Sequence, residues 1–318
     1  LRTILLFLFT IPVFGSKFII PIALLILTIP NFKYLSSSFY FYSLLFCVPI
    51  IFSKLFFSTE FDPTIFYVVV SILISVNKIS ISNKSLKTIL FIFIFFHLLS
   101  VVSILQTGYD FIPDFIYGES RHYVQNNTLI NFRPSGIFQE PSTFAIHYLI
   151  IAILLLREKT SENIKYVFLS ILASLFTFSV ISVLFILILI PFLKKAKYIF
   201  LIFIPLGFFI YEFLNQFALN KINNYFDIGI QNYSRFELLF KYLDNFYFAG
   251  FYENLSNYVA YDLGPIIFLF IYAGIFSFPI IIYISMRCIK DLNLLVLVFT
   301  KISVVSPLFW VVLNNKRT

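Results

Sequence analysis

Long apolar segments recur along the whole chain, and they limit what it can fold into more than any other feature. They begin at Leu1 and continue to Leu313, with only short polar interruptions between them. Hydrophobic residues make up 60% of the 318 residues and charged residues 12%, about half the charged fraction of a soluble domain. Residues 88–105 are apolar on every face, whereas a transmembrane β-barrel would alternate apolar and polar positions. The sequence therefore predicts an all-α polytopic integral membrane protein.

The net charge of +8 does not indicate a nucleic-acid partner, because the lysines cluster in short segments between the apolar ones. That distribution is typical of the cytoplasmic loops of membrane proteins. The two cysteines, Cys47 and Cys288, lie far apart in or beside apolar segments, so they predict neither a disulfide framework nor a metal cluster. No metal or cofactor is expected, and the lipid bilayer is the first predicted partner.

The charged loops set the orientation of the predicted spans. Three lysines and no acidic residue stand in residues 77–87, which places that loop in the cytoplasm. Counting from there predicts roughly nine to eleven transmembrane helices in a single membrane domain, residues 1–318. It also places residues 107–141 and residues 215–262 outside, as two large periplasmic loops.

Two apolar stretches do not divide simply into full spans. Lys165 and Lys194 bracket one of them, and a hairpin turning near residues 179–182 would keep both ends in the cytoplasm. Each arm would be shorter than the roughly 20 residues of a full span, so these arms are expected to tilt or re-enter inside protein. The other stretch, residues 292–313, is divided by Lys301 and predicts one span or two.

Ten of the fifteen acidic residues in the chain lie in or near the two predicted outer loops. These ten are Asp110, Asp114, Glu119, Glu140, Glu212, Asp227, Glu237, Asp244, Glu253 and Asp262. Long loops between otherwise short connections usually carry function, so any chemistry is expected on the outer face. The alternative is that the two loops only cover the outer mouth of the helix bundle.

The most informative string in the first loop runs from Arg133 to Thr143 and reads Arg-Pro-Ser-Gly-Ile-Phe-Gln-Glu-Pro-Ser-Thr. It joins a cation, a flexible glycine and a carboxylate to the start of a helix, because Pro141 suits the first helical position. A helix N-terminus beside an arginine can bind an anion such as a lipid-linked phosphate or diphosphate. In the alternative reading, Pro141 merely begins a span and Arg133 meets lipid head groups.

His147 follows Glu140 by seven residues, so on one helix the two side chains share a face two turns apart. Such a carboxylate–imidazole pair can serve as an acid and a base. The alternative is that His147 is a polar residue that only packs inside the helix bundle, and we interpret His97 in the same way.

The second loop contains a capping box from Ser234 to Glu237, followed by apolar residues at helical spacing. It predicts an amphipathic helix over about residues 235–249 at the outer interface, with Gly250 as its C-terminal stop. Arg235 lies in the first turn, where the helix dipole does not favour a cation, so a partner is expected. That partner is either a ligand phosphate or a loop carboxylate such as Glu140, and a surface helix without chemistry is the alternative.

The pattern R-x-x-G-x-x-x-E-P, formed by Arg133, Gly136, Glu140 and Pro141, resembles that of bacterial O-antigen and capsule polymerases of the Wzy type. A second outer loop with an arginine followed by a glycine, here Arg235 and Gly250, is similar to the other large periplasmic loop of that family. The strings Asp262-Leu-Gly264-Pro and Tyr272-Ala-Gly274-Ile also resemble the family's entry into its next span. The likeness covers roughly residues 106–286.

The resemblance implies a metal-independent glycosyltransferase of the bacterial inner membrane, with its active site facing the periplasm. It would act on undecaprenyl-diphosphate-linked oligosaccharides, and a chain-length regulator and a flippase are its further expected partners. The implied catalytic residues are Arg133 and Arg235, which would hold the donor diphosphate, and Glu140, which would orient an arginine or act as a base. The implied substrate-binding residues are Arg121, Gly136, His147 and Gly250.

Two other activities and a non-enzymatic assembly role compete with this reading. The related O-antigen ligases are expected to use a histidine in the second large loop, and residues 215–262 contain none. A flippase for the same lipid-linked sugars would need charged or broken helices along a membrane path. The predicted spans contain little ionisable material besides His97, His147 and Lys301, which favours chemistry at the surface.

Overall fold

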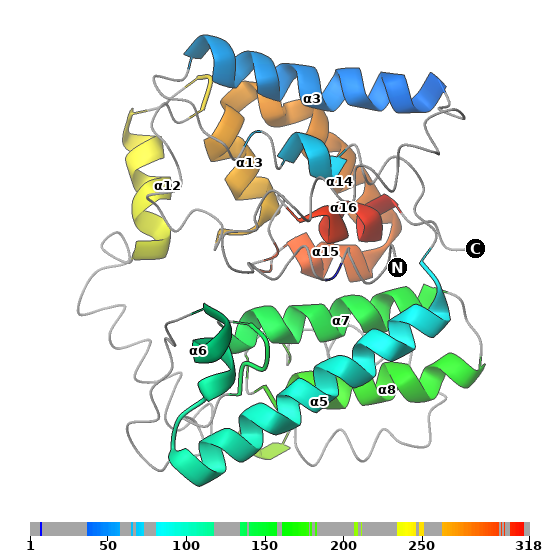
Figure 1. The fold of residues 1–318 in the computed structure, drawn as a ribbon. Helices are drawn as coiled ribbons and strands as arrows, with labels where there is room; N and C mark the ends of the chain where they lie inside the picture. The colour runs from blue at the N-terminus through cyan, green and yellow to red at the C-terminus, as the bar shows by residue number, and fades with distance from the viewer. Residues whose placement is uncertain are drawn as a thin grey trace. The chain divides into compact units, whose positions relative to one another are not determined.

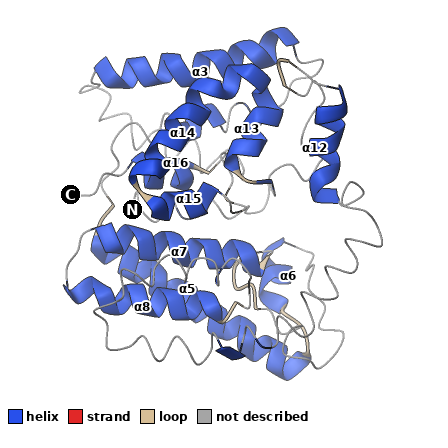
Figure 2. Cartoon of the chain, turned by 180° about the vertical axis from the view of Figure 1, so that it is seen from behind, coloured by secondary structure: helices blue, strands red, loops and turns tan. Residues whose placement is uncertain are grey.

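The computed structural model describes residues 7, 37–57, 65, 68–72, 81–117, 134–138, 140–157, 161–177, 179, 182, 207–208, 211, 234–245, 248–250, 263–298, 300, 302 and 306–314. Regular secondary structure in these residues is helical, with no β-strand among them, as the sequence predicts (Figure 2). The chain divides into two compact units. Unit 1 comprises Leu1–Thr10, Lys17–Ser80 and Tyr225–Asn315, and unit 2 comprises Ile11–Ser16, Ile81–Asn224 and Lys316–Thr318.

Unit 2 is built around three long helices and one short one: α5 (Asn83–Thr107), α6 (Phe111–Tyr117), α7 (Pro141–Arg157) and α8 (Ser161–Leu175). Helices α7 and α8 lie side by side, and α5 packs across both of them (Figure 1). Helix α5 ends at Gly108, whose left-handed backbone (φ 72°) lets its N–H donate to the Ile104 carbonyl oxygen at 2.8 Å. Only three residues separate α7 from α8, so these neighbours are antiparallel.

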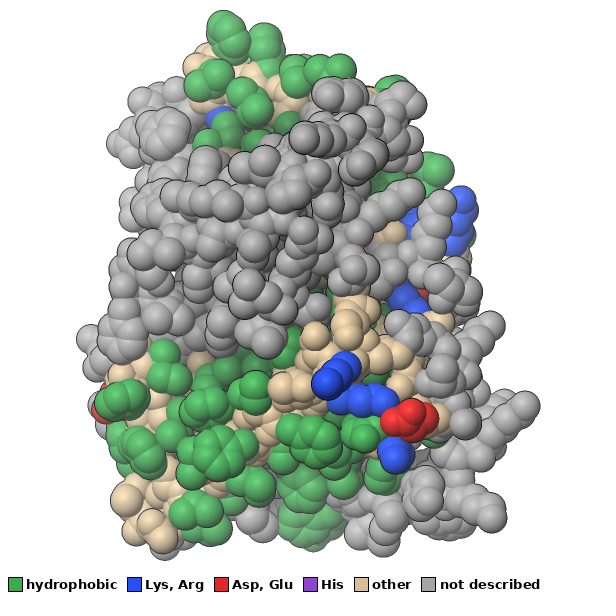
Figure 3. All heavy atoms as spheres, turned by 45° about the vertical axis from the view of Figure 1, so that its right-hand side comes forward, with side chains coloured by type: hydrophobic (Ala, Val, Ile, Leu, Met, Phe, Trp, Pro, Cys, Tyr) green, Lys and Arg blue, Asp and Glu red, His purple; other side chains and the backbone are tan. Residues whose placement is uncertain are grey.

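The middle of helix α5 has apolar side chains on both faces and polar side chains only on the buried one, so residues 88–105 are not apolar on every face as the sequence indicates. His97, Ser100 and Ser103 are buried against the rest of unit 2. The exposed residues recur at helical spacing along the other side: Phe91, Phe95, Leu98, Val102 and Leu105. On the face shown in Figure 3, hydrophobic side chains gather in the lower part, with charged side chains at one side of them. A surface helix of a water-soluble protein would instead carry polar side chains on its exposed face.

Helix α8 ends within the apolar stretch where the sequence predicts a hairpin. The helix stops at Leu175, and the hydroxyls of Thr177 and Ser182 each donate to the Ser174 carbonyl oxygen at 2.7 Å. The Thr177 N–H donates to the same carbonyl oxygen at 3.2 Å, so this oxygen at the end of the helix accepts from one backbone and two hydroxyl groups. The Ser182 N–H also donates to the Ser179 carbonyl oxygen at 2.9 Å, so the described residues have local turns both before and within the predicted residues 179–182, and the hairpin itself stays a prediction.

Unit 1 contains α3 (Ser37–Phe57), α12 (Ser234–Asn245), α13 (Pro265–Ala273), the 3-10 helix η6 (Gly274–Ser277), α14 (Phe278–Lys290), α15 (Leu292–Val298) and α16 (Pro307–Asn314). Helices α13, η6 and α14 follow one another without a gap, and each of them contacts α3. Arg287 joins α14 to the end of α16 by donating to the Leu313 carbonyl oxygen from Nε at 2.9 Å and from Nη2 at 2.6 Å.

Apolar residues are also exposed along α3 and α14. On α3 the exposed set includes Phe41, Leu44, Val48, Phe52 and Leu55, while Ser53 and Lys54 on the same helix are buried. On α14 it comprises Phe278, Ile282, Met286 and Ile289. Within the described residues, α5 and the continuous segment Pro265–Lys290 are long and apolar enough to cross a membrane, and Leu44–Phe57 and Pro141–Arg157 are shorter apolar helices. The predicted total of roughly nine to eleven spans stays a prediction.

Candidate functional site

The described part of the Arg133–Thr143 string forms a tight turn that leads into α7. The turn is closed by the Phe138 N–H, which donates to the Ser135 carbonyl oxygen at 3.0 Å. Gly136, the second residue of the turn, has a left-handed backbone (φ 57°). An L-residue with a Cβ is strained in that region, and the Cβ would also strike the ring of Phe144. Both the backbone and the packing therefore require glycine at position 136.

A buried carboxylate, Asp110, fastens this turn to the end of α5. Its Oδ2 accepts hydrogen bonds from the Ser135 N–H at 3.1 Å, from the Ser135 hydroxyl at 3.2 Å and from the Ser100 hydroxyl. Its Oδ1 accepts from the Ile112 N–H at 3.4 Å, as a capping residue at the start of α6 does. One side chain thereby connects α5, the start of α6 and the turn.

Glu140 stands directly before α7, which begins at Pro141 as the sequence predicts. Its backbone carbonyl oxygen accepts from the N–H groups of Thr143 and Phe144 at 3.1 and 3.2 Å. Its carboxylate Oε2 accepts from the Ser142 hydroxyl at 3.1 Å, which holds the negative charge at the helix N-terminus, where the dipole stabilises it. Glu140 is therefore the residue that starts the helix, and its carboxylate lies beside the first turn.

His147 lies two turns further along α7, and its ring is fixed on two sides. Nδ1 lies 2.7 Å from the Thr143 carbonyl oxygen, and because a carbonyl oxygen only accepts, Nδ1 carries the hydrogen. The ring stacks on Phe138 with their centroids 4.3 Å apart. The turn and the histidine thus support each other, and in the neutral ring Nε2 is a hydrogen-bond acceptor.

Aromatic rings surround this part of unit 2. Phe93 of α5 makes edge contacts with Phe138, Phe144, His147 and Tyr148, at centroid distances of 5.7 to 6.2 Å. His97, also on α5, places Nδ1 3.3 Å from the Tyr148 hydroxyl. The predicted reading of His97 as a packed polar residue agrees with this position. These ring contacts pack α5 against α7 and against the turn that precedes it.

The arginines of the predicted site are not part of this described geometry. Arg121 and Arg133 lie outside the described residues. Arg235 lies in the first turn of α12, in unit 1, and its side chain is also outside the described set. The structure brings together Gly136, Glu140 and His147 in unit 2, while Gly250 belongs to unit 1.

Gly250 is explained by a close crossing of two backbone segments in unit 1. It has φ 91°, and a Cβ there would meet the carbonyl group of Tyr272. Gly274 shows the same relation in reverse, because a Cβ on it would meet the Phe248 carbonyl oxygen and the Gly250 nitrogen. The Ile275 N–H donates to the Phe248 carbonyl oxygen at 3.0 Å, and the Ser53 hydroxyl donates to the next carbonyl oxygen, that of Ala249, at 2.6 Å.

Sequence reasoning did not assign Asp110, Ser100 or Ser135 to the site. Asp110 appeared only as one of ten acidic residues near the outer loops. A signal was nevertheless present, because His97, Ser100 and Ser103 repeat at helical spacing on one face of an otherwise apolar segment. An acidic residue directly after such a segment could have been assigned to that polar face.

No group of three or more His, Cys, Asp or Glu residues within the described ranges could hold a metal ion. Comparison of the chain with protein-family models, with curated proteins and with solved structures finds no match. The functional interpretation therefore depends on the residues themselves and on the motif that they form.

Proposed function

We propose that this chain is a polytopic membrane protein and that the exposed apolar faces of α3, α5 and α14 contact lipid. What supports this proposal is that rows of large apolar side chains are exposed on these three helices, while serines, a histidine and a lysine are among the residues that α3 and α5 bury. Exposing apolar surface to water costs about 25 cal/mol per Å². A bilayer removes that cost and leaves the polar groups inside the protein, where they find partners.

We further propose that the protein is a polysaccharide polymerase of the Wzy type, acting at the periplasmic face of the bacterial inner membrane. The observation that carries this proposal is the motif from Arg133 to Pro141, whose described part is a glycine turn leading directly into a helix N-terminus. The Glu140 carboxylate already lies at that N-terminus, so the anionic group of the substrate is assigned to the arginines and not to the helix dipole. The proposed substrates are undecaprenyl-diphosphate-linked oligosaccharides.

In the proposed reaction, a hydroxyl oxygen of the acceptor sugar forms a bond with the anomeric carbon of the donor glycan. The bond from that carbon to the lipid diphosphate breaks, the diphosphate leaves with the electron pair, and the hydroxyl proton passes to a base. Negative charge grows on the diphosphate in the transition state, so cations placed beside it accelerate the reaction. Arg133 and Arg235 are assigned to that task, with Arg121 as a further candidate.

Glu140 is assigned either to orienting one of these arginines or to accepting the proton of the acceptor hydroxyl. Its carboxylate at the first turn of α7 is compatible with both tasks, because it is held through Ser142 at a fixed position. His147 is assigned to substrate binding at the same helix, and Gly136 and Gly250 to the backbone conformations that both loops require.

The proposal is tested with the purified protein in lipid nanodiscs, supplied with lipid-linked repeat units and analysed for chain length on a gel. The wild-type protein should produce a ladder, and Arg133→Ala and Arg235→Ala should each abolish it. Arg→Lys at either position should also impair elongation if the arginine makes paired contacts with phosphate oxygens. Lys241→Ala is the matched control, because it removes a cation from the same helix as Arg235 and should leave the ladder intact.

Deletion of the gene in the host separates the competing activities. Surface polysaccharide reduced to one repeat unit on its acceptor would indicate a polymerase. Loss of all surface polysaccharide, with lipid-linked units trapped on the cytoplasmic side, would indicate a flippase. Long chains that remain on the carrier lipid without reaching their final acceptor would indicate a ligase. Either of the last two results would overturn the proposed activity.

A further inference from the structure

We propose that Asp110 is the positioning residue of the first-loop site, and that its carboxylate holds the turn at residues 135–138 in the conformation needed for glycan transfer. The inference rests on the proposed function, because it takes this loop as part of the active site. Asp110 itself has no assigned contact with substrate. Its role is exerted through the turn and through the helix that follows the turn.

The geometry around Asp110 is that of a fixed anchor rather than a surface contact. The residue is 1% exposed, and Ser100 and Ser135 beside it are also buried. Ser100 of α5 contacts both Asp110 and the turn. Its hydroxyl donates to Asp110 Oδ2, and the Gly136 N–H donates to the same Ser100 oxygen at 3.4 Å. The turn is therefore held to α5 at two consecutive residues, Ser135 and Gly136.

A carboxylate suits this position because it only accepts hydrogen bonds, and every neighbour described around it is a donor. Three of the four bonds end on Oδ2 and one, the longest, ends on Oδ1. An asparagine could keep the three bonds if its carbonyl oxygen replaced Oδ2. It would lose the negative charge and the bond from the Ile112 N–H, and its NH₂ group would face that N–H as a second donor. An alanine would remove both acceptor oxygens and with them all four bonds, which is costly because it leaves buried donors without these partners.

Asp110 is connected to the other site residues through a few residues of the chain and through side-chain packing. Ser135, which Asp110 holds, follows Arg133 by two positions in the sequence. At the other end of the turn, Phe138 stacks on His147 and stands two residues before Glu140. Release of Ser135 would therefore free the turn at one end and disturb the stacking at the other. A displacement of about 1 Å in a site of this kind can lower the rate about 100-fold.

The test compares Asp110→Ala, Asp110→Asn and Ser135→Ala with the matched control Ser182→Ala. Ser182 is a buried serine of the same unit whose hydroxyl donates to the Ser174 carbonyl oxygen at 2.7 Å, away from the turn and from Asp110. Two quantities are measured for each variant after isolation of monodisperse protein. One is the glycan elongation rate per folded molecule. The other is the labelling rate of a cysteine placed at Ile137, which is buried, by a water-soluble maleimide.

Asp110→Ala should lower the elongation rate about 100-fold and raise the labelling rate of the residue 137 cysteine about tenfold or more. Asp110→Asn should stay within about threefold of the parent in both measurements, because it can keep three acceptor bonds. Ser135→Ala should fall between them, and Ser182→Ala should change neither rate. The buried Cys47 and Cys288 give the background, which is measured in protein without the added cysteine.

Three outcomes would overturn the inference. If Asp110→Asn is as inactive as Asp110→Ala while labelling stays slow in both, Asp110 acts through its charge or proton and not through position. If labelling rises while elongation is unchanged, the anchor exists but the turn does not belong to the site. If elongation per folded molecule is unchanged and only the yield of folded protein drops, the role of Asp110 is stability alone. Where the parent protein elongates no glycan, the proposed function fails, and the labelling rates still decide whether Asp110 holds the turn.

Discussion

The ring of Phe144 lies where a Cβ atom on Gly136 would have to stand. The two residues are eight positions apart, one in the turn and one in the first turns of α7, and the turn folds back over the helix that it starts. Because Phe144 is completely buried, its ring has little space into which it could move. The glycine of the R-x-x-G-x-x-x-E-P pattern is therefore required by this close approach as well as by its backbone angle.

Gly136→Ala should destabilise the protein more than Gly108→Ala. Both glycines have left-handed backbones, with φ 57° and 72°, but a Cβ on Gly108 would have no heavy atom within 4 Å. Gly108→Ala should therefore lower the free energy of unfolding only by the cost of a left-handed backbone at an alanine, about 1–2 kcal/mol. Gly136→Ala should lose about 1–3 kcal/mol more through crowding against Phe144. Denaturant unfolding of the two variants in detergent measures the difference. Equal losses of stability would show that the Phe144 ring moves aside at little cost.

The start of α7 and the need for glycine at position 136 could be predicted from the sequence, because both are local. A proline after a carboxylate marks a helix start, and a glycine between polar residues marks a turn. The partners of Asp110 could not be predicted in the same way. Ser100 and Ser135 lie 10 and 25 positions from it on either side, and only the assembled turn brings their hydroxyls to one carboxylate.

Gly250 has a structural role that differs from the one the sequence predicts. The sequence indicates a glycine that ends an amphipathic helix over about residues 235–249. The structure has a helix in that region, but α12 ends at Asn245, five residues before the glycine. Gly250 is instead required by the backbone of Tyr272, 22 positions away, which approaches too closely for any side chain. Contacts between distant segments of this kind leave no local pattern in the sequence.

Alanine at Gly250 or Gly274 should destabilise unit 1 strongly, because each Cβ would strike backbone atoms that cannot rotate away. Overpacking of this kind costs about 1–3 kcal/mol, and the left-handed backbone adds about 1–2 kcal/mol. Gly207→Ala is the control, since a Cβ there would meet nothing within 4 Å. Thermal unfolding of the three variants checks the prediction. A normal melting temperature for Gly250→Ala would mean that the two segments can separate at little cost.

A spin label on the exposed face of α5 should report a lipid environment. With nitroxides attached to cysteines at Leu98 and Val102, we expect high accessibility to oxygen and low accessibility to a water-soluble nickel chelate in nanodiscs. The expectation follows from the exposed apolar row on this helix, opposite its buried His97 and Ser100. A label at Lys84, near the helix start, should show the reverse pattern. High nickel accessibility at Leu98 would place this face in water and contradict the proposed membrane span.

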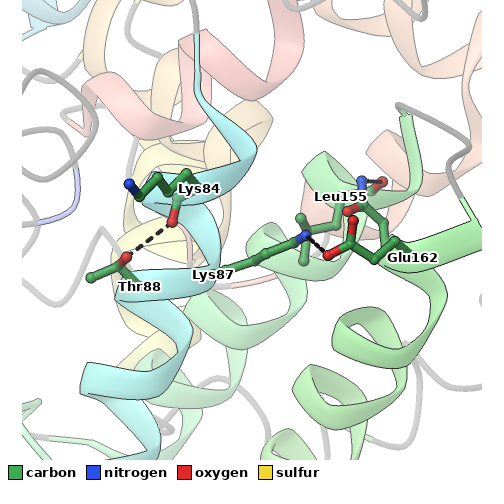
Figure 4. A network of polar contacts seen from close by, with 6 residues as sticks. Lys84, Lys87, Thr88, Leu155 and Glu162 are labelled. Atoms are coloured by element: carbon green, nitrogen blue, oxygen red, sulfur yellow. Dashed lines mark hydrogen bonds and ion pairs between the residues drawn. The ribbon is translucent and has the colours of Figure 1, made fainter.

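The ion pair between Lys87 and Glu162 should make the stability of unit 2 depend on pH. It joins α5 to the first turn of α8, with Lys87 Nζ 2.8 Å from Glu162 Oε1 (Figure 4). The hydrogen bond and the charge of Lys87 lower the pKa of Glu162 below its usual value of 4.5, with a smaller contribution from Lys165. A lowered pKa in the folded state means that the ionised carboxylate stabilises the fold. That contribution is fully present above the unfolded pKa and is lost as the pH falls through the folded one.

We therefore expect Glu162→Gln to be less stable than the parent at neutral pH, and the difference to vanish as the pH falls below 4.5. The effect should be small, because the Glu162 side chain is 64% exposed, and it should weaken in about 1 M salt, where the screening length falls to about 3 Å. Lys87→Ala should abolish the same pH dependence. Lys84→Ala should not, because the Lys84 ammonium points away from Glu162 (Figure 4). Denaturant unfolding across this pH range measures all three variants. A pH profile that Lys84→Ala changes as much as Lys87→Ala would show that Glu162 responds to the general charge of the loop and not to its one partner on α5.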